Sequence, residues 1–317
     1  MTTYQSVAVT RVVTLLFVSG LVTAAAPVLA GEPLELEGPY FGQQPPGIEA
    51  EVFAPGVISV EGRYEFAISF APGGERLLFT IQPREGSAQV MQTAVVDGFW
   101  TRPEPVSLSG GARKAEMEAF FAPDGERVYF APYDEGLDVR IWTVGIDGER
   151  WVDPEPLRGP IADASAFFPT TAESGALYYT NIAERKFHRA TREADGSWRT
   201  DVLAIEPGGH VFIAPDESFA LVDGRGEDSR GKGDIYVVFA TGDGGWSKRI
   251  NLGPGVSSEF SESCPSLSAD GRYLFFSRYN EPDDVAQIYW ADSAVIETAR
   301  QRLLVEEAVR DSIAWAL

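Results

Sequence analysis

A phrase of about a dozen residues recurs five times along this 317-residue chain, at intervals of about fifty residues. Each copy joins an apolar stretch to a small-residue turn and then to a stretch rich in aromatic and β-branched side chains. Self-similarity at such a period is the signature of a repeat architecture. The copies read ISFAPGGERLLFT from Ile68, AFFAPDGERVYFA from Ala119, SAFFPTTAESGALYYT from Ser165, HVFIAPDESFALV from His210 and SLSADGRYLFFS from Ser266.

A second phrase, centred on tryptophan, runs in phase with the first. Its copies read DGFWTRPEPVSL, GERWVDPEPLRG, DGSWRTDVLAI and GGWSKRINLG, so four of the seven tryptophans follow one period. Between the two phrases lies a further stretch such as RIWTV or DIYVVF. Each repeat therefore contains four short segments of strand composition, separated by turns that contain glycine. The four tryptophans are Trp100, Trp151, Trp198 and Trp246.

Four short strands per repeat predict one blade of a β-propeller. A helical repeat is disfavoured, because Gly and Pro leave no uninterrupted helical window before residue 292. Five repeats predict five blades, and six remain possible only if residues 32–47 form one more. The copies align on five anchor residues, which place Thr170 and Thr171 in the third turn and Glu217 in the fourth. The anchors are Pro72, Pro123, Pro169, Pro215 and Ala269.

The fifth repeat lacks a tryptophan strand, which would leave a free sheet edge. The segment EVFAPGVIS, residues 51–59, resembles the PEPVSL part of the second phrase. We expect it to supply the missing outer strand and to close the ring, because exposed edges invite aggregation. The propeller domain is thus predicted to cover residues 31–291.

Residues 292–317 differ from the repeats. They contain neither Gly nor Pro, and they place Val295, Ala299, Leu303, Val309 and Ile313 among charged residues. This spacing predicts a C-terminal amphipathic helix. The helix either packs against the propeller or serves to dock a partner.

Residues 1–30 have the pattern of a signal peptide. Arg11 precedes an uncharged stretch, and Val28 and Ala30 suit cleavage before Gly31. The alternative is an uncleaved N-terminal anchor, although Pro27 weakens a membrane helix. We expect a mature protein that is periplasmic or secreted and has no membrane span.

The chain carries 26 Lys and Arg against 47 Asp and Glu, a net charge of −21. This charge argues against binding to nucleic acid or to an anionic membrane. One Cys and two His argue against a disulfide framework, a thiolate zinc site and a His-based metal centre. We therefore expect no cofactor and no metal.

Three glutamates recur at one place in the repeat. Glu65, Glu116 and Glu262 each lie seven residues before their anchor, near the mouth of the expected channel. They either bind a cation or basic peptide, act as an acid/base pair as in propeller glycosidases, or bind a neighbouring blade's turn. His210 enters the fourth inner strand, where other repeats carry Ala67, Glu118 or Cys264. It either faces the channel and titrates or is structural.

The phrases SFAPGGERLLF, FAPDGERVYF and LSADGRYLFFS resemble the repeats of TolB-like propellers, which are relatives of WD-repeat propellers. The resemblance extends over about residues 40–297 and looks like that of exported bacterial members. It implies the propeller fold, usually with six blades, but no particular activity, because propellers serve unrelated functions.

The sequence contains no coherent catalytic constellation and no G-x-S-x-G motif. It therefore favours a non-enzymatic scaffold outside the cytoplasm, which binds a protein or peptide with a basic segment through one face or the central channel. The channel-mouth candidates for binding are Glu65, Glu116, His210 and Glu262. The alternative is a carbohydrate-active hydrolase that uses paired carboxylates there.

Overall fold

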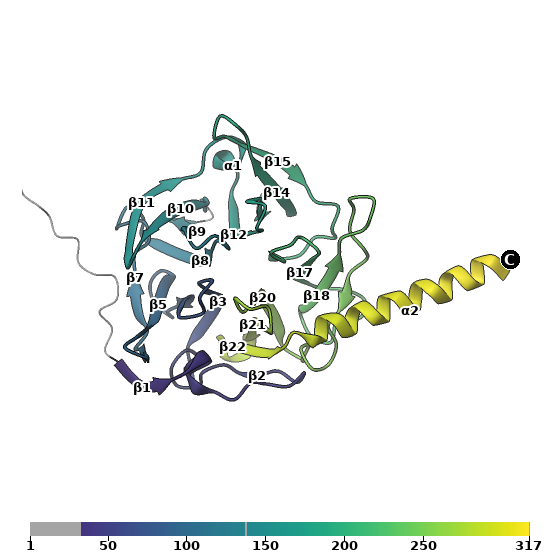
Figure 1. Cartoon of the computed structure of the whole chain (residues 1–317), viewed down its shortest axis with the longest axis horizontal. Helices are drawn as coiled ribbons and strands as arrows, with labels where there is room; N and C mark the ends of the chain where they lie inside the picture. Colours follow the sequence, from purple (N-terminus) through teal and green to yellow (C-terminus); the bar gives the residue numbers. More distant parts are fainter. Residues whose placement is uncertain (1–32, 137, 317) are drawn as a thin grey trace, which may run out of the picture.

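Five groups of antiparallel strands stand around a common axis (Figure 1). The computed structural model describes residues 33–136 and 138–316, so the expected leader lies outside the described residues. Within that part of the chain, no helix is long and apolar enough to cross a membrane. The expected all-β propeller is confirmed, with five blades and a C-terminal helix.

Each blade runs outward from an inner strand beside the axis to an outer strand at the rim. Blade 1 contains β3 (Tyr64–Phe70), β4 (Arg76–Gln82), β5 (Gln89–Val96), β6 (Phe99–Thr101) and β7 (Glu104–Val106). Blade 2 contains β8 (Ala115–Phe121), β9 (Arg127–Tyr133), β10 (Trp142–Asp147) and β11 (Arg150–Pro156). Blade 3 contains β12 (Ala166–Thr171), β13 (Leu177–Asn181), β14 (Lys186–Arg192) and β15 (Trp198–Val202).

Blade 4 has the shortest inner strand, and its outer strand has only two residues, like that of blade 5. It contains β16 (Val211–Ile213), β17 (Phe219–Gly224), β18 (Asp234–Phe239) and β19 (Ile250–Asn251). Blade 5 contains β20 (Ser261–Leu267), β21 (Tyr273–Asn280), β22 (Val285–Asp292) and β2 (Glu51–Val52). The remaining elements are β1 (Pro33–Glu37), which pairs with β6, η1 (Pro39–Gly42), α1 (Pro160–Asp163), η2 (Glu281–Asp283) and α2 (Ala294–Ala316).

The ring closes where its two ends meet. Each inner strand contacts the next, and β20 of blade 5 contacts β3 of blade 1. The fourth strand of blade 5 comes from the N-terminal end, because β2 pairs with β22 through Glu51 opposite Trp290. Phe53 follows β2 and is buried against the rings of Phe275 and Trp290. The distances between ring centroids are 4.9 Å to Phe275 and 5.2 Å to Trp290. Two chain ends that are distant in sequence thus share one blade.

The third repeat turns four residues later than its proline anchor predicts. In blade 1, the first hairpin turn is closed by a hydrogen bond from Gly74 N–H to the carbonyl oxygen of Ala71. In blade 3, the same bond runs from Gly175 N–H to the carbonyl oxygen of Ala172. Glu173 is therefore the counterpart of Pro72, and Thr170 and Thr171 lie inside β12. The alignment on Pro169 was wrong, because this proline occupies a bulge of β12, where a missing N–H is tolerated.

Four of the five inner strands carry an irregularity at an equivalent place, four residues before the turn begins, whereas β16 of blade 4 begins just after this place and has a regular ladder. The ladder skips between Phe66 and Ser69 in β3, and the same shift recurs in β8, β12 and β20. A bulge re-aims the side chain it carries. The residues at this bulge position, one from each blade, are Ala67, Glu118, Phe168, His210 and Cys264. All except His210 have a positive φ, between 52° and 55°.

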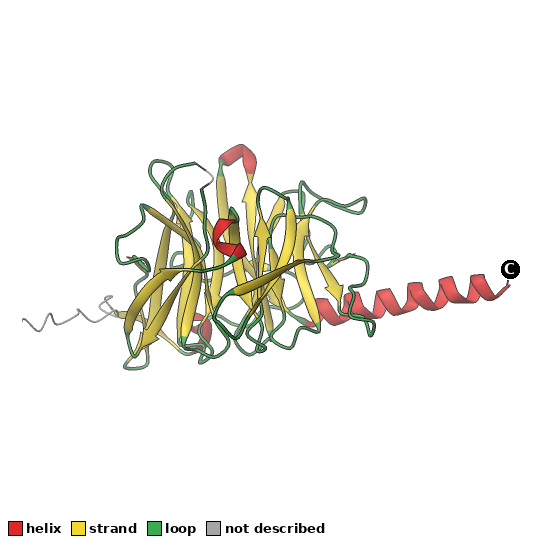
Figure 2. Cartoon of the chain, turned by 90° about the horizontal axis from the view of Figure 1, so that it is seen from above, coloured by secondary structure: helices red, strands yellow, loops and turns green. Residues whose placement is uncertain are grey.

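The C-terminal helix α2 is packed along only part of its length. Val295, Ala299 and Leu303 are buried against blades 4 and 5. Val309 and Ile313 are exposed, and this half of α2 leaves the rim of the disc (Figures 1 and 2). The expected packing against the propeller is therefore confirmed for the first half of α2, and the docking of a partner by its second half stays a prediction.

Candidate functional site

The three recurring glutamates bind the connectors that lead from one blade to the next. Glu116, at the start of β8, accepts hydrogen bonds from the backbone N–H of Leu108 and Ser109, at 2.6 and 3.0 Å. The hydroxyls of Ser107 and Ser109 donate to the same carboxylate. This connector joins the outer strand of blade 1 to the inner strand of blade 2, so Glu116 fastens two consecutive blades together.

Glu262 repeats this arrangement in blade 5. It accepts hydrogen bonds from the N–H and hydroxyl of Ser258, in the connector from blade 4, and from Nε of Arg278 at 2.8 Å. The glutamates therefore hold the connector between blades, rather than the neighbouring blade's turn that the sequence suggested. Both carboxylates are buried, so neither is open to a substrate.

Glu65 has the same position in blade 1 and a perturbed acidity. It accepts a hydrogen bond from Val60 N–H at 3.1 Å and pairs with Arg63, while its second oxygen has no hydrogen-bond partner. Burial raises the pKa of Glu65 to about 7, although Arg63 opposes this shift. Such a pKa suits a general acid, but Glu65 is fully buried and offers no surface to a ligand.

Polar groups from three blades meet at the axis of the propeller. Glu118 of blade 2, His210 of blade 4 and Cys264 of blade 5 place their ligand atoms within 4.8 Å of one another. Together with Asp223 of β17 they form what we call the axial cluster. Glu118 and Cys264 lie at bulges, and His210 lies at the equivalent place directly before β16. Asp223 binds the backbone of both His210 and Cys264. Equivalent positions of three inner strands therefore bring this cluster together.

Asp223 organises the axial cluster. One carboxylate oxygen accepts from the N–H of Gly209 and of His210, at 2.9 and 2.8 Å. The other contacts Nδ1 of His210 and accepts from the N–H of Cys264 at 3.0 Å. Asp223 is itself buried. A single carboxylate therefore fixes the position of two members that belong to different blades.

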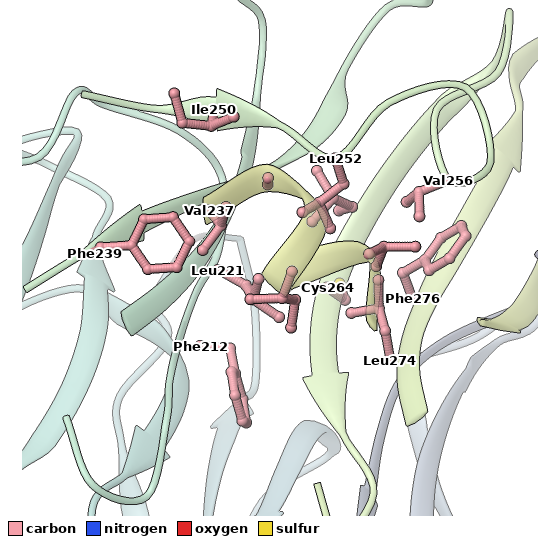
Figure 3. Close-up of a cluster of buried hydrophobic side chains, with 14 of the residues drawn as sticks. Phe212, Leu221, Val237, Phe239, Ile250, Leu252, Val256, Cys264, Leu274 and Phe276 are labelled. Carbon is pink, nitrogen blue, oxygen red and sulfur yellow. The ribbon is translucent and has the colours of Figure 1, made fainter. Parts of the chain in front are cut away.

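The remaining contacts fix Glu118 and the imidazole ring. Glu118 receives the N–H of Phe168 on Oε2 at 2.7 Å, and its own N–H donates to Thr80 of blade 1. The edges of Phe167 and Phe168 meet the His210 ring at 5.2 and 4.7 Å between centroids. Cys264 lies among apolar side chains of blades 4 and 5 (Figure 3). These contacts hold Glu118 and the His210 ring in place beside the axis.

The electrostatics of the cluster oppose a reactive thiol. Burial alone would lower the pKa of His210, but Asp223 and Cys264 raise it well above its ordinary value. Burial raises the pKa of the Cys264 thiol, although His210 opposes this shift. Nucleophilic cysteines need a lowered pKa. The Cys264 thiol therefore lacks the lowered pKa of a catalytic nucleophile.

Two clefts lie on the face of the disc that carries the first hairpin turn of each blade, which we call the turn face. One has a volume of about 500 Å³ and adjoins Tyr40, Glu75 and Arg272. The other, of about 420 Å³, crosses the turns of blades 3, 4 and 5 beside the start of α2. Ala269 and Asp270 line both. The acidic residues of the second cleft are Glu173, Asp216, Asp270 and Glu297, with Arg300 as its base.

Sequence reasoning identified His210 but missed Glu118 and Asp223 as its partners. Glu118 and Cys264 were recognised as residues of the same repeat position, and that equivalence was the available signal. Equivalent positions of a propeller's inner strands converge on its axis. Asp223 carries no such signal, because it lies on the second strand of its blade.

No protein-family model and no curated protein sequence matches this chain. A protein named as TolB from Agrobacterium tumefaciens is similar in structure, with 16% identity over 73% of this chain and 77% of that chain and a TM-score of 0.49. TolB from Acinetobacter baumannii shares 13% identity over 72% of this chain and 54% of its own, with a TM-score of 0.45. This β-propeller is thus similar in structure to TolB proteins, in line with the resemblance of its repeats.

A protein described as a gluconolactonase is also similar to this chain. It shares 15% identity over 76% of this chain and 91% of its own, with a TM-score of 0.46. The similar structures therefore differ in the function that their names give. At these identities they show the fold alone, and the function of this propeller must be argued from its own residues.

Proposed function

We propose that the protein is a non-catalytic scaffold that holds a basic segment of a protein partner on its turn face. The observation that carries this proposal is the pair of adjoining acidic clefts, which share Asp270. A chain with a net charge of −21 attracts cationic partners over a distance. Export of the mature protein, expected from residues 1–30, would place this partner outside the cytoplasm.

Two acids of the clefts are held in their charged form. Hydrogen bonds from Ser218 hold the pKa of Asp216 below its ordinary value. Partial burial opposes ionisation of Asp270, but hydrogen bonds from Ser268 and from the N–H of Arg272 still lower its pKa. Both carboxylates are therefore anionic at neutral pH, and each can pair with a Lys or Arg of the partner.

The free half of α2 extends the same face. Val305 and Val309 are exposed at 63% and 53%, and Ile313 at 57%. With about 100° of rotation per residue, Val305 and Val309 lie roughly a third of a turn away from the buried Ala299 and Leu303. Ile313 lies in line with the buried Val295, whereas Val305 and Val309 form an exposed apolar face that is offset from the strip that docks α2 on the propeller. This exposed face suits a groove in the same partner, as in helix-in-groove recognition.

The alternative function, a carbohydrate-active hydrolase, needs two acids that are open to a sugar. Glu65, Glu116 and Glu262 are buried and engaged by connectors or by arginines. No observation of the described residues favours this alternative over a scaffold.

The proposal is tested by site-specific photo-crosslinking in the cells that produce the protein. A photoreactive amino acid is placed at Ala269, which lines both clefts, at Val309 on α2, and at Glu135 on the opposite face as a control. We expect Ala269 and Val309 to capture the same protein and Glu135 to capture none. An adduct that forms equally at Glu135, the lack of an adduct at Ala269, or an adduct only between two copies of this chain would contradict the proposal.

A charge variant tests the acidic clefts themselves. Replacing Asp216→Asn and Asp270→Asn together should weaken binding of the captured partner and reduce its dependence on salt. The matched control replaces Glu85→Gln and Glu135→Gln, which changes the net charge equally on the opposite face. An equal loss of partner binding in the two double variants would show that the acidic clefts do not contribute specifically to binding.

A further inference from the structure

We propose that Glu118, His210 and Cys264 bind a divalent transition metal of the zinc class on the axis of the propeller. They offer a carboxylate oxygen, an imidazole nitrogen and a sulfur, all within 4.8 Å of one another. These are three of the ligand types that zinc takes in proteins. The proposal is independent of the scaffold function, because the cluster lies apart from the two clefts of the turn face.

The spacing of one pair of ligand atoms, from Glu118 and His210, fits a common ion. Bonds of about 2.0–2.3 Å at tetrahedral angles place two ligand atoms roughly 3.3–3.7 Å apart. Oε1 of Glu118 and Nε2 of His210 are 3.5 Å apart. This distance is too long for a strong direct hydrogen bond between a charged pair, whereas it equals the separation of two ligands of a common metal.

Hydrogen bonds from the surroundings hold all three ligand residues in place. Asp223 holds Nδ1 of His210, which leaves Nε2 as the coordinating atom. A carboxylate behind a ligating imidazole is the usual outer partner in metal sites, where it fixes the ring. The same Asp223 holds the backbone of Cys264, and the N–H of Phe168 occupies Oε2 of Glu118, leaving Oε1 on the side of His210.

The donor set discriminates between classes of metal. Ca²⁺ and Mg²⁺ take oxygen ligands, so a sulfur and an imidazole exclude them. A mixture of sulfur, nitrogen and oxygen suits zinc and the neighbouring divalent ions. Three protein ligands leave one tetrahedral position for a water molecule. The His210 side chain keeps 18% of its surface exposed, so an ion can reach the site on that side.

This inference revises the expectation drawn from composition. One cysteine and two histidines argue against sites that are built from several copies of either residue. A mixed site needs only one of each, supplied here by blades 4 and 5 and completed by a glutamate of blade 2. Such a site would clamp three of the five blades together at the centre of the ring.

The experiment uses the full mature protein, stripped with a chelator and then titrated with Zn²⁺ or Co²⁺. We expect one tightly bound ion per chain by elemental analysis, a rise in the unfolding temperature with added Zn²⁺, and a thiolate-to-cobalt absorption band with Co²⁺. Cys264→Ala should abolish that band. This variant should fold, because Ala67 occupies the same bulge position in blade 1.

Two further variants separate ligation from a general loss of stability. Glu118→Gln should lose the bound ion, while Glu116→Gln, the same change two residues earlier in β8, should keep it. Asp223→Asn should weaken Zn²⁺ binding by about 10–100-fold. If the native protein binds no stoichiometric ion, or Cys264→Ala and Glu118→Gln bind as well as it does, the proposal is overturned and the cluster is a metal-free ion-pair network.

Discussion

The carboxylate of Asp223 in blade 4 accepts a hydrogen bond from the backbone N–H of Cys264 in blade 5, over 3.0 Å. Neither residue is exposed. The contact joins the second strand of one blade to the bulge of the next, at an interface that is also bridged by the backbone of Gly233 and Ser261. It shows that blades 4 and 5 are held together near the axis by a hydrogen bond to a polar side chain as well as by apolar packing.

The first prediction concerns this carboxylate. Asp223→Ala would leave the N–H groups of His210 and Cys264 without their acceptor and His210 without its counter-charge, whereas Gly209 N–H keeps the backbone carbonyl of residue 223. We expect a loss of about 3–5 kcal/mol in the free energy of unfolding, as for other broken buried charge pairs. Urea denaturation measures it. Asp223→Asn keeps a carbonyl acceptor and should lose less, and equal stability of Asp223→Ala and the native protein would contradict the bonding described.

The second prediction is a pH dependence of stability that comes from Glu65. Its pKa is raised from 4.5 to about 7 in the folded chain. Between these values the folded state binds more protons than the unfolded state, so stability should fall as pH rises from about 4.5 to about 7. Glu65→Gln cannot titrate and should lack this contribution.

The measurement compares the two proteins by urea denaturation at about pH 5 and about pH 8. The native protein should lose more stability than Glu65→Gln between these conditions. The difference between the proteins isolates Glu65 from the other groups that titrate in this range. A parallel pH dependence in both would show that Glu65 is ionised throughout.

The third prediction tests how the ring is closed. Phe53 is fully buried and brings the N-terminal segment against Trp290 of blade 5. Phe53→Ala should cost about 3–5 kcal/mol, since it removes a large core side chain at the closing blade. Ile48, which is 56% exposed in the same segment, is the control, and Ile48→Ala should change stability by less than about 0.5 kcal/mol. Similar small effects in both would mean that this segment does not seal the ring.

The fourth prediction concerns the two halves of α2. Deleting residues 308–317 should leave the free energy of unfolding within about 0.5 kcal/mol of the native value, because Val309 and Ile313 are exposed. Leu303→Ala should cost about 2–4 kcal/mol, because Leu303 is buried against the propeller. Thermal and urea unfolding measure both. A large loss on truncation would show that the end of α2 packs on the disc.

The repeat phrases predicted the blades because each phrase encodes a local structure. Alternating apolar residues, a turn and an aromatic strand form a hairpin wherever they occur. The third repeat shows the limit of this reasoning. Pro169 looks like a turn residue in sequence, yet the hairpin bond of Gly175 places the turn at Ala172. A proline is compatible with a bulge as well as with a turn, so composition alone does not decide between them.

The sequence by itself determined the architecture: five units, four strands in each, and a helical tail. It also determined the acidic charge and the recurring glutamates. Only the tertiary structure decided what these residues do. Glu116 and its counterparts were assigned to the channel mouth, but they bind connectors. Glu118 and His210 are 92 positions apart in sequence and 3.5 Å apart between their closest side-chain atoms. The local sequence pattern is enough to form a strand. Residues of different inner strands meet at the axis only when the ring of blades is closed.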